Sequence, residues 1–560
     1  MQDWDSPEQS TVMVADFMGG SSVPKDDVMV KLRRILPAAL LISRAVAVSE
    51  TVDLTYTKYV GKSLSNGVSE WLGMRFAAAP VGELRFMPPQ DPPEHDDPVL
   101  ADTVGLGCLG TGKKPDDDTR SEDCLFLNVQ APTNATSDSK LPVMVYIQGG
   151  GFNTNGNPNV NGTGLIKAAG GNLVFVALNY RVGPYGFLTN GDEITPNNGL
   201  RDQRKAFEWV QQHISKFGGD PDHVVLVGTS AGAASVVFHL TAGNGKDRGL
   251  FVGAAANEPS FATELTVKES QFYYNNLAVR AGCAVKDSLS CLRNKTAAEL
   301  QAVNFNIPLP GGSNPPSYQW LPVIDGDFLT DYTYKLIREG KFIKVPTILG
   351  DDRNGGTKFA PDDASSLADS NQYMLDQYPT ITPGQFADIN TMYPNPNDTA
   401  CPETGCYWRQ TSNTYQEVRY TCPALRINEA MTEAGATSYA YLWDVEDPEE
   451  MAAGLGVPHT AELEALIGPA YTDEEPESYK PGGINELASP LIQAYYTSFV
   501  RTLDPNKFRL EGAAEWKTWE QGPNRRLRYG TNGTTDMEDI GDELRKRCDY
   551  WIAHGESMLL

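Results

Sequence analysis

Positive charge is scarce in this sequence. Lysine and arginine together number 46, whereas aspartate and glutamate number 72, which leaves a formal net charge of −26 and a pI near 4.7. A chain with this charge repels phosphate backbones and anionic lipid surfaces unless it carries a local basic patch. The longest Lys/Arg run has only three residues, Arg545-Lys546-Arg547. We therefore expect no nucleic-acid partner.

Long apolar runs and internal repeats are also missing. The apolar segment 35–42 is too short to span a bilayer, so we expect no stable membrane anchor. No repeat, low-complexity block or Pro/Ser-rich linker divides the 560 residues. Hydrophobic residues make up 40% and charged residues 21% of the chain. This ordinary globular composition excludes collagen-like, coiled-coil and wholly disordered chains.

The amino terminus has the pattern of a recessed signal peptide. Residues 1–28 are polar and acidic, but from Met29 a basic stretch is followed by an apolar core and by Ala45-Val-Ala47, a small-x-small cleavage site. The alternative is a buried helix of the domain. We expect residues 1–47 to be an N-terminal extension with a signal peptide over 29–47, followed by a single domain over 48–560.

Cysteines and glycosylation sequons also favour the secretory pathway. The eight cysteines include three close pairs, although sequence alone cannot choose among 105 pairings. Together with the leader they predict a secreted glycoprotein from an oxidising compartment. The close pairs are Cys108/Cys124, Cys283/Cys291 and Cys401/Cys406, which leaves Cys422 with Cys548, and the sequons begin at Asn134, Asn161, Asn294, Asn397 and Asn532.

The middle of the chain alternates short apolar segments with a helical pattern. Continuous apolar runs are typical of strands covered on both faces. Between Gly199 and Phe217 the apolar residues Ala206, Phe207 and Val210 instead fall on one helical stripe. This order predicts an α/β fold with a large, mostly parallel sheet and helices on both faces. The expected strands are residues 143–147, 173–179, 224–227, 345–349 and 438–443.

A Gly-x-Ser-x-Gly pattern, Gly228 to Gly232, lies between an expected strand and an Ala-rich segment that favours a helix. This is the context of a nucleophile elbow, in which the serine takes a strained backbone conformation and larger side chains two residues away would collide. The alternative is a plain glycine-rich turn. The context favours Ser230 as a nucleophile.

A glycine run, Gly149-Gly150-Gly151, follows the strand 143–147. Acyl transfer builds negative charge on a carbonyl oxygen, which free backbone N–H groups stabilise. A phosphate-binding loop is disfavoured because no Gly-Lys-Ser/Thr follows the run. We expect the amides of Gly150, Gly151 and Ala231 to form an oxyanion hole.

The general base is constrained by the scarcity of histidine. His95 precedes the serine, whereas in hydrolases with a Gly-x-Ser-x-Gly elbow the histidine comes after the serine and the acid in the chain. His459 follows the expected strand 438–443 in a Gly/Pro-rich loop, where such a histidine belongs. The other four lie in helices, before the elbow strand or near the carboxyl terminus: His213, His223, His239 and His554.

Together these features resemble the type-B carboxylesterases of the α/β-hydrolase superfamily, which include cholinesterases and fungal secreted lipases. The resemblance covers nearly the whole chain after residue 50 and implies Ser230 as nucleophile, His459 as general base and a Cys108–Cys124 disulfide near the gorge. The matching motifs are Glu122-Asp-Cys124-Leu-Phe-Leu-Asn128-Val, Gln148-Gly-Gly-Gly-Phe152, Asn179-Tyr-Arg181-Val-Gly, Asn198-Gly-Leu-Arg-Asp202-Gln203, Phe217-Gly-Gly-Asp220-Pro, Gly228-Thr-Ser-Ala-Gly232 and Gly456-Val-Pro-His459.

The triad acid departs from the family pattern. The family loop Gly-x-x-x-Asn/Asp-Glu-Gly-Thr-x-Phe corresponds to residues 350–359, where Gly355 takes the place of the glutamate. Glycine cannot fix the histidine tautomer or stabilise the imidazolium. We expect either Asp352, or less directly Asp351, to substitute, or the enzyme to work as a Ser/His dyad. A pseudoenzyme is the third reading.

The function that follows is hydrolysis of soluble carboxylic esters by a secreted serine esterase, without cofactor or metal. The segment between Cys108 and Cys124 is polar, with Leu109 as its single large apolar residue. It therefore lacks the apolar face of the lid that lipases use to bind an oil–water interface. The alternatives are a biosynthetic enzyme that uses the same Ser/His site for acyl transfer, cyclisation or dehydration, and a noncatalytic binding protein on the esterase fold.

Overall fold

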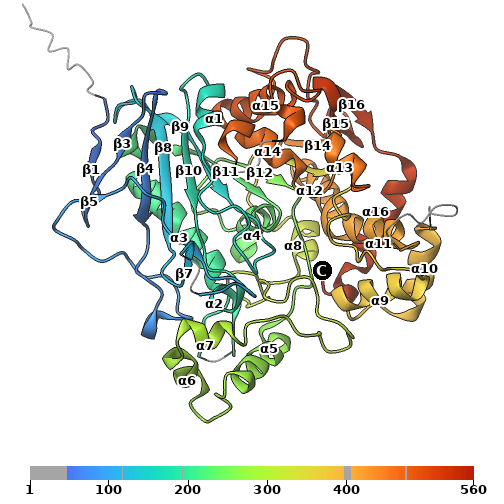
Figure 1. Ribbon diagram of the computed structural model, residues 1–560. Coiled ribbons are helices and arrows are strands. Elements are labelled where there is room, and N and C mark those ends of the chain that lie inside the picture. Colours follow the sequence, from blue (N-terminus) through green and yellow to red (C-terminus); the bar gives the residue numbers. More distant parts are fainter. Residues whose placement is uncertain (1–46, 116–117, 192, 396–404, 473–475) are drawn as a thin grey trace, which may run out of the picture. The chain divides into compact units, whose positions relative to one another are not determined.

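An eleven-stranded sheet organises the described part of the chain, and Figure 1 shows how its strands lie side by side. The seven consecutive strands from β15 to β10 are parallel, and the strands at both margins are antiparallel to their neighbours. In spatial order the strands are β16 (Thr534–Asp539), β15 (Arg525–Gly530), β14 (Ser438–Asp444), β13 (Thr347–Asp352), β12 (Gly253–Asn257), β11 (Gly219–Thr229), β9 (Leu141–Ile147), β10 (Val174–Leu178), β8 (Phe126–Pro132), β4 (Val68–Arg75) and β3 (Lys62–Ser63).

The computed structural model describes residues 47–115, 118–191, 193–395, 405–472 and 476–560. These residues belong to one compact unit. The expected signal peptide over 29–47 lies outside the described residues except for Ala47, and its prediction therefore stays open. Within the described residues no helix is long and apolar enough to cross a membrane.

Helices cover both faces of the sheet because its central strands are apolar on both sides. In β9, Val143 and Val145 join the hydrophobic core that includes α3 and α4, whereas Met144 and Tyr146 join the core that includes α1 and α15. Alternate side chains of a strand point to opposite faces, so a strand buried on both faces reads as a continuous apolar run. This arrangement confirms the predicted α/β-hydrolase fold class.

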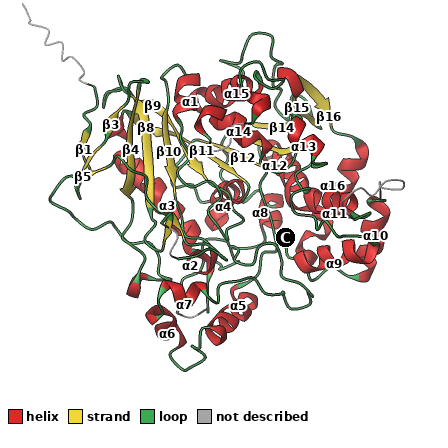
Figure 2. Cartoon of the chain, viewed as in Figure 1, coloured by secondary structure: helices red, strands yellow, loops and turns green. Residues whose placement is uncertain are grey.

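The remaining elements surround this sheet (Figure 2). Two small sheets consist of β1 (Thr51–Asp53), β2 (Lys58–Val60) and β5 (Val99–Leu100), and of β6 (Gly107–Cys108) and β7 (Arg120–Ser121). The α-helices are α1 (Thr163–Ala168), α2 (Gly183–Phe187), α3 (Asn198–His213), α4 (Ala231–Gly245), α5 (Val267–Arg280), α6 (Ser288–Asn294), α7 (Ala297–Gln301), α8 (Thr333–Arg338), α9 (Leu367–Gln377), α10 (Pro383–Met392), α11 (Trp408–Gln416), α12 (Cys422–Glu433), α13 (Pro448–Ala452), α14 (Ala461–Ile467), α15 (Ala488–Thr502) and α16 (Asp542–His554).

All five expected strands are present, with boundaries shifted by a few residues. One central strand, β12, was not expected. Its sequence, Gly-Ala-Ala-Ala-Asn, contains none of the branched or aromatic residues that mark a strand. It is nevertheless buried along its whole length between β11 and β13. This strand matters for the site, because the residue that follows it is Glu258.

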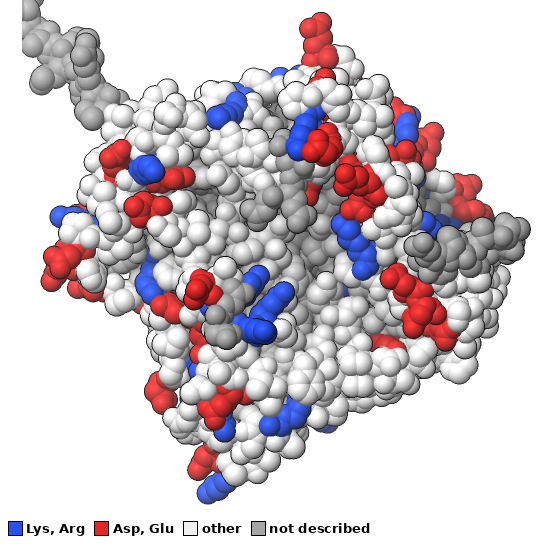
Figure 3. Space-filling view, in the orientation of Figure 1, with Lys and Arg blue, Asp and Glu red and all other residues white. Residues whose placement is uncertain are grey.

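Acidic and basic side chains are interspersed on the molecular face shown in Figure 3. On this face neither sign of charge is gathered in one block. Such a distribution is typical of a solvated surface.

Candidate active site

Ser230 lies at a sharp turn between β11 and α4. Its backbone angles, φ 60° and ψ −121°, are unusual for a residue with a side chain. A Cβ atom on Gly228 would collide with the carbonyl group of Gly232, and one on Gly232 would collide with the carbonyl oxygen of Ile147. The close passage of β9, β11 and α4 thus requires both glycines, and it presents Ser230 at the carboxyl edge of the parallel strands.

His459 reaches the serine from the loop between β14 and α14. Its Nε2 lies 2.8 Å from Ser230 Oγ, within hydrogen-bond distance. The ring of Tyr420 stacks on the imidazole, with centroids 4.4 Å apart. Asn354 holds the loop, because its amide donates to the Val457 carbonyl and its side-chain oxygen accepts from the Val457 amide. The histidine therefore has a fixed orientation.

Glu258 supplies the carboxylate that faces the other imidazole nitrogen. Its Oε2 contacts His459 Nδ1. Glu258 directly follows β12, whereas the family's acid loop follows the neighbouring strand β13. Two amides complete its surroundings: Asp352 N–H donates to Oε1 over 2.9 Å, and Thr460 N–H donates to Oε2 over 3.1 Å. Burial alone would raise the pKa of Glu258, but His459 and these two donors outweigh it and lower the pKa below its usual value.

The family's acid position, Gly355, lies against this carboxylate. A Cβ atom on Gly355 would collide with Glu258 Oε1. The glycine therefore leaves room for a glutamate that comes from the neighbouring strand. The space where the resemblance expects a carboxylate is occupied by one, but its backbone source is β12 and not the loop after β13.

The two aspartates proposed as substitutes have other partners. Asp352 Oδ2 accepts from the Ala461 amide over 2.9 Å, and Asp351 pairs with Arg526 over 3.1 Å. The expectation that Asp352 contacts the histidine is corrected by this geometry, as is the expectation of a bare Ser/His pair. The side chain of Asp352 turns toward α14, and only its backbone amide serves the site, by donating to Glu258.

A second pair of carboxyl groups is buried behind Glu258. Asp352 and Glu462 are both fully buried, and one oxygen from each lies within 4.8 Å of a Glu258 oxygen. Burial and the charge of Glu258 raise the pKa of Glu462 to about 8, and burial with the neighbouring carboxylates raises the pKa of Asp352 well above its usual value. Among the described residues these three could offer oxygens to a metal ion. Because Glu258 already binds His459, the raised pKa values of Asp352 and Glu462, which favour their uncharged forms, account for the cluster without an ion.

The glycine run after β9 lies beside Ser230. A Cβ atom on Gly149 would come 2.9 Å from Ser230 Cβ, and Gly150 and Gly151 have φ angles of 113° and 60°. Ala231 is the first residue of α4, where a backbone N–H has no intrahelical acceptor. The structure thus brings together the three residues expected to bind an oxyanion, Gly150, Gly151 and Ala231, around one serine.

Three disulfides are present among the described residues. They join Cys108 to Cys124, Cys283 to Cys291 and Cys422 to Cys548, as the sequence suggested. Cys401 lies outside the described residues, so its suggested bond with Cys406 is not described, and Asn397 also lies outside them. Of the other sequon residues, Asn134, Asn294 and Asn532 are exposed, whereas Asn161 is half-buried and accepts from Gln130.

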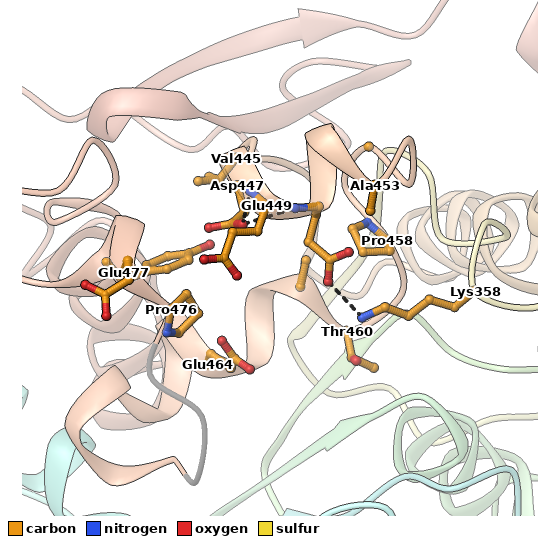
Figure 4. Close-up of a pocket in the computed structure, with 14 residues that line it drawn as sticks. Lys358, Val445, Asp447, Glu449, Ala453, Pro458, Thr460, Glu464, Pro476 and Glu477 are labelled. Atoms are coloured by element: carbon orange, nitrogen blue, oxygen red, sulfur yellow. Dashed lines mark hydrogen bonds and ion pairs between the residues drawn. The ribbon is translucent and has the colours of Figure 1, made fainter. Parts of the chain in front are cut away.

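A cavity of about 560 Å³ opens on the outer side of the His459 loop, next to Pro458 and Thr460 (Figure 4). Ser230 does not line it. Its lining is acidic, with Asp447, Glu449, Glu450, Glu464 and Glu477, and the single lysine, Lys358, is paired with Glu450. This cavity is separate from the reacting groups.

The chain is similar in sequence and structure to known carboxylesterases and lipases. Residues 49–551 match the family model described as "Carboxylesterase family". Lipase 1 of Geotrichum candidum is 35% identical over 60% of this chain and 67% of its own length, and Secreted lipase 1 of Botryotinia fuckeliana is 29% identical over 91% and 94%. The crystal structure of Aspergillus niger EstA superposes with a TM-score of 0.88 at 40% identity, over 92% of this chain and 99% of that chain. The chain belongs to the carboxylesterase family and is a carboxylic ester hydrolase.

Proposed function

We propose that the protein is a secreted serine esterase in which Ser230, His459 and Glu258 form the catalytic triad. The observation that carries this proposal is the continuous contact from Ser230 Oγ to His459 Nε2 and from His459 Nδ1 to Glu258 Oε2. The order of the three along the chain is serine, acid, histidine, as in other α/β-hydrolases.

The geometry supports the following reaction. Ser230 Oγ attacks the ester carbonyl carbon while His459 Nε2 takes its proton, and the amides of Gly150, Gly151 and Ala231 stabilise the negative oxygen. Glu258 stabilises the imidazolium through Nδ1. His459 then protonates the leaving alcohol, a water molecule attacks the acyl-enzyme through the same base, and the carboxylic acid leaves.

Glu258 removes the reason to expect an impaired enzyme. A Ser/His dyad, or use of the site for acyl transfer, cyclisation or dehydration, is suggested only by the absence of the triad acid from its family position. With a buried and ionised glutamate against His459 Nδ1, hydrolysis needs no special explanation. The polar loop between Cys108 and Cys124 supports soluble esters as substrates, and the secreted relatives and the three disulfides support an extracellular location.

Hydrolysis of a 4-nitrophenyl ester of a short fatty acid tests the proposal. We expect turnover by the wild type, labelling of Ser230 by a fluorophosphonate, and loss of both in Ser230→Ala. Ser215→Ala, at an exposed serine on the same domain, is the matched control and should leave both unchanged. Equal rates for the wild type and Ser230→Ala would refute the assignment of the nucleophile.

A further inference from the structure

Arg419 is a buried cation that the reaction above does not use. It belongs to η3 (Glu417–Thr421), a π-helical turn between α11 and α12, and its side chain is 2% exposed. An arginine side chain keeps its charge at any pH that a protein tolerates. A charge held this far from water must be compensated by a partner.

The other buried arginines all have a carboxylate partner. Arg181 pairs with Asp202 over 2.7 Å, Arg85 with Glu122 over 2.6 Å and Arg526 with Asp351 over 3.1 Å. No ion pair is described for Arg419 in the parts of the chain that the structure covers. Its Nε donates to Ser260 Oγ over 2.9 Å, whereas its buried Nη2 has no hydrogen-bond partner among the described residues.

The surroundings of this guanidinium belong to the active site. Ser260, to which it donates, in turn donates its backbone N–H to the carbonyl oxygen of the nucleophile Ser230 over 3.2 Å. The Arg419 guanidinium carbon lies 5.2 Å from the ring centroid of Tyr318 and 5.9 Å from that of Tyr420. A Cβ atom on Gly151, in the oxyanion loop, would collide with the Tyr318 ring, and Tyr420 stacks on His459. Arg419 is therefore one residue away from the serine, the histidine and the oxyanion loop.

The surrounding tyrosines, including Tyr378, which hydrogen-bonds to the guanidinium, soften the cost of a buried cation but do not neutralise its charge. A carboxylate would neutralise it and would accept a charge-assisted hydrogen bond from the unpartnered Nη2. We infer that Arg419 forms an anion subsite beside Ser230, which selects esters that carry a second, free carboxylate. This inference rests on the proposed function, since it names the substrate class of the same site.

A matched pair of substrates tests the subsite. The 4-nitrophenyl hemiester of glutaric acid carries a free carboxylate on the acyl side, and its methyl ester has the same chain without the charge. A second pair, 4-acetoxybenzoate and its methyl ester, places the carboxylate on the alcohol side. We expect the wild type to prefer the charged member of one pair by about 10- to 100-fold in kcat/KM, the range for a hydrogen bond to a charged group.

Variants at position 419 separate recognition from structure. Arg419→Met should abolish that preference, measured as the ratio of kcat/KM between the charged and uncharged members of each pair, and Arg419→Lys should restore part of it. Equal losses on charged and uncharged esters, or no wild-type preference in either pair, would overturn the subsite. If Arg419→Met does not fold, competitive inhibition of the wild type by glutarate, compared with its dimethyl ester, decides the question, and absence of inhibition counts against the subsite.

The two proposals fail in different ways. If the wild type and Ser230→Ala hydrolyse the uncharged esters equally, the proposed function is wrong. If Ser230 is required for the uncharged esters but no charged ester is preferred, only the subsite is wrong.

Discussion

Glu258 Oε1 occupies the space that a side chain at Gly355 would need. The two residues lie after neighbouring parallel strands, β12 and β13, whose carboxyl ends meet at the same edge of the sheet. One position holds the carboxylate and the other must then be small. This relationship makes the role of the acid testable from both sides.

Glu258→Gln should lower kcat by about 10⁴-fold, as removal of the triad acid does in other serine hydrolases. The reason is that the amide cannot stabilise the imidazolium at Nδ1. Asp352→Asn is the matched control, because burial and the neighbouring carboxylates raise the pKa of Asp352 and so favour the protonated form that the amide imitates; its kcat should stay close to the wild-type value. Steady-state kinetics on one ester measures both. A larger loss in Asp352→Asn than in Glu258→Gln would return the role to Asp352.

Gly355→Glu should lower activity in the wild-type background, because the new side chain collides with Glu258 and places a second carboxylate in the same space. The double variant Glu258→Gly/Gly355→Glu should recover most of the loss. Glu258 has a φ of 51°, a left-handed conformation that glycine adopts without strain. The ratio of kcat/KM between the single and double variants is the measurement. A single variant that exceeds the wild type would contradict the placement of the acid.

Glu462 should make stability depend on pH. Its pKa is raised to about 8 in the folded chain, from an ordinary value of 4.5. Between these pH values the folded state keeps a proton that the unfolded state has released, so the free energy of unfolding falls as pH rises from about 4.5 to 8 and this contribution is level above 8. Glu462→Gln should flatten the slope in urea unfolding at pH 5, 6.5, 8 and 9. Glu464→Gln, on the same helix, should not; equal slopes in both variants would speak against a buried proton.

The Cys422–Cys548 disulfide should contribute strongly to stability, since it joins α12 to α16 across 126 residues of sequence. Replacement of both cysteines by serine should lower the free energy of unfolding by about 2–5 kcal/mol. Urea unfolding at constant pH measures the change. The corresponding change at Cys283 and Cys291, only 8 residues apart, should cost less because the loop that it closes is shorter. The reverse ranking would be inconsistent with a loop-closure effect.

Gly232→Ala should disrupt the elbow, because its Cβ atom would collide with the carbonyl of Ile147 on the neighbouring strand. Strand and helix must then separate, at a cost of about 3 kcal/mol in stability, with loss of activity. Gly541→Ala is the control, since a Cβ atom there meets nothing within 4 Å. The test is to compare the thermal unfolding midpoints and the kcat values of the two variants. Wild-type behaviour of Gly232→Ala would show that strand and helix can separate at the elbow without cost.

Local patterns in the sequence account for much of this structure. β9 and β11 could be predicted because their side chains are apolar on both faces, and Ser230 could be predicted because the glycines around it have a steric cause. The alternation of strands and helices was enough to predict the sheet. Each of these signals lies within a few residues of the element that it predicts.

Glu258 could not be found in this way. Its strand is made of small residues, and its partner His459 is about 200 positions away, so only the folded sheet brings them together. The family pattern instead places the acid in the loop after β13. One signal in the sequence could have indicated this acid. Glu258 comes shortly after a run of alanines, in Asn257-Glu258-Pro259, and it lies between Ser230 and His459 in the chain, as a triad acid should.

The space shared by Glu258 and Gly355 also bears on which residues this site tolerates. Glutamate at both positions would crowd the space, and glycine at both would leave His459 without a carboxylate. Stepwise replacement of one acid by the other therefore passes through a crowded site or through a site without the acid. Related sequences are expected to combine a glutamate at one of the two positions with a small residue at the other.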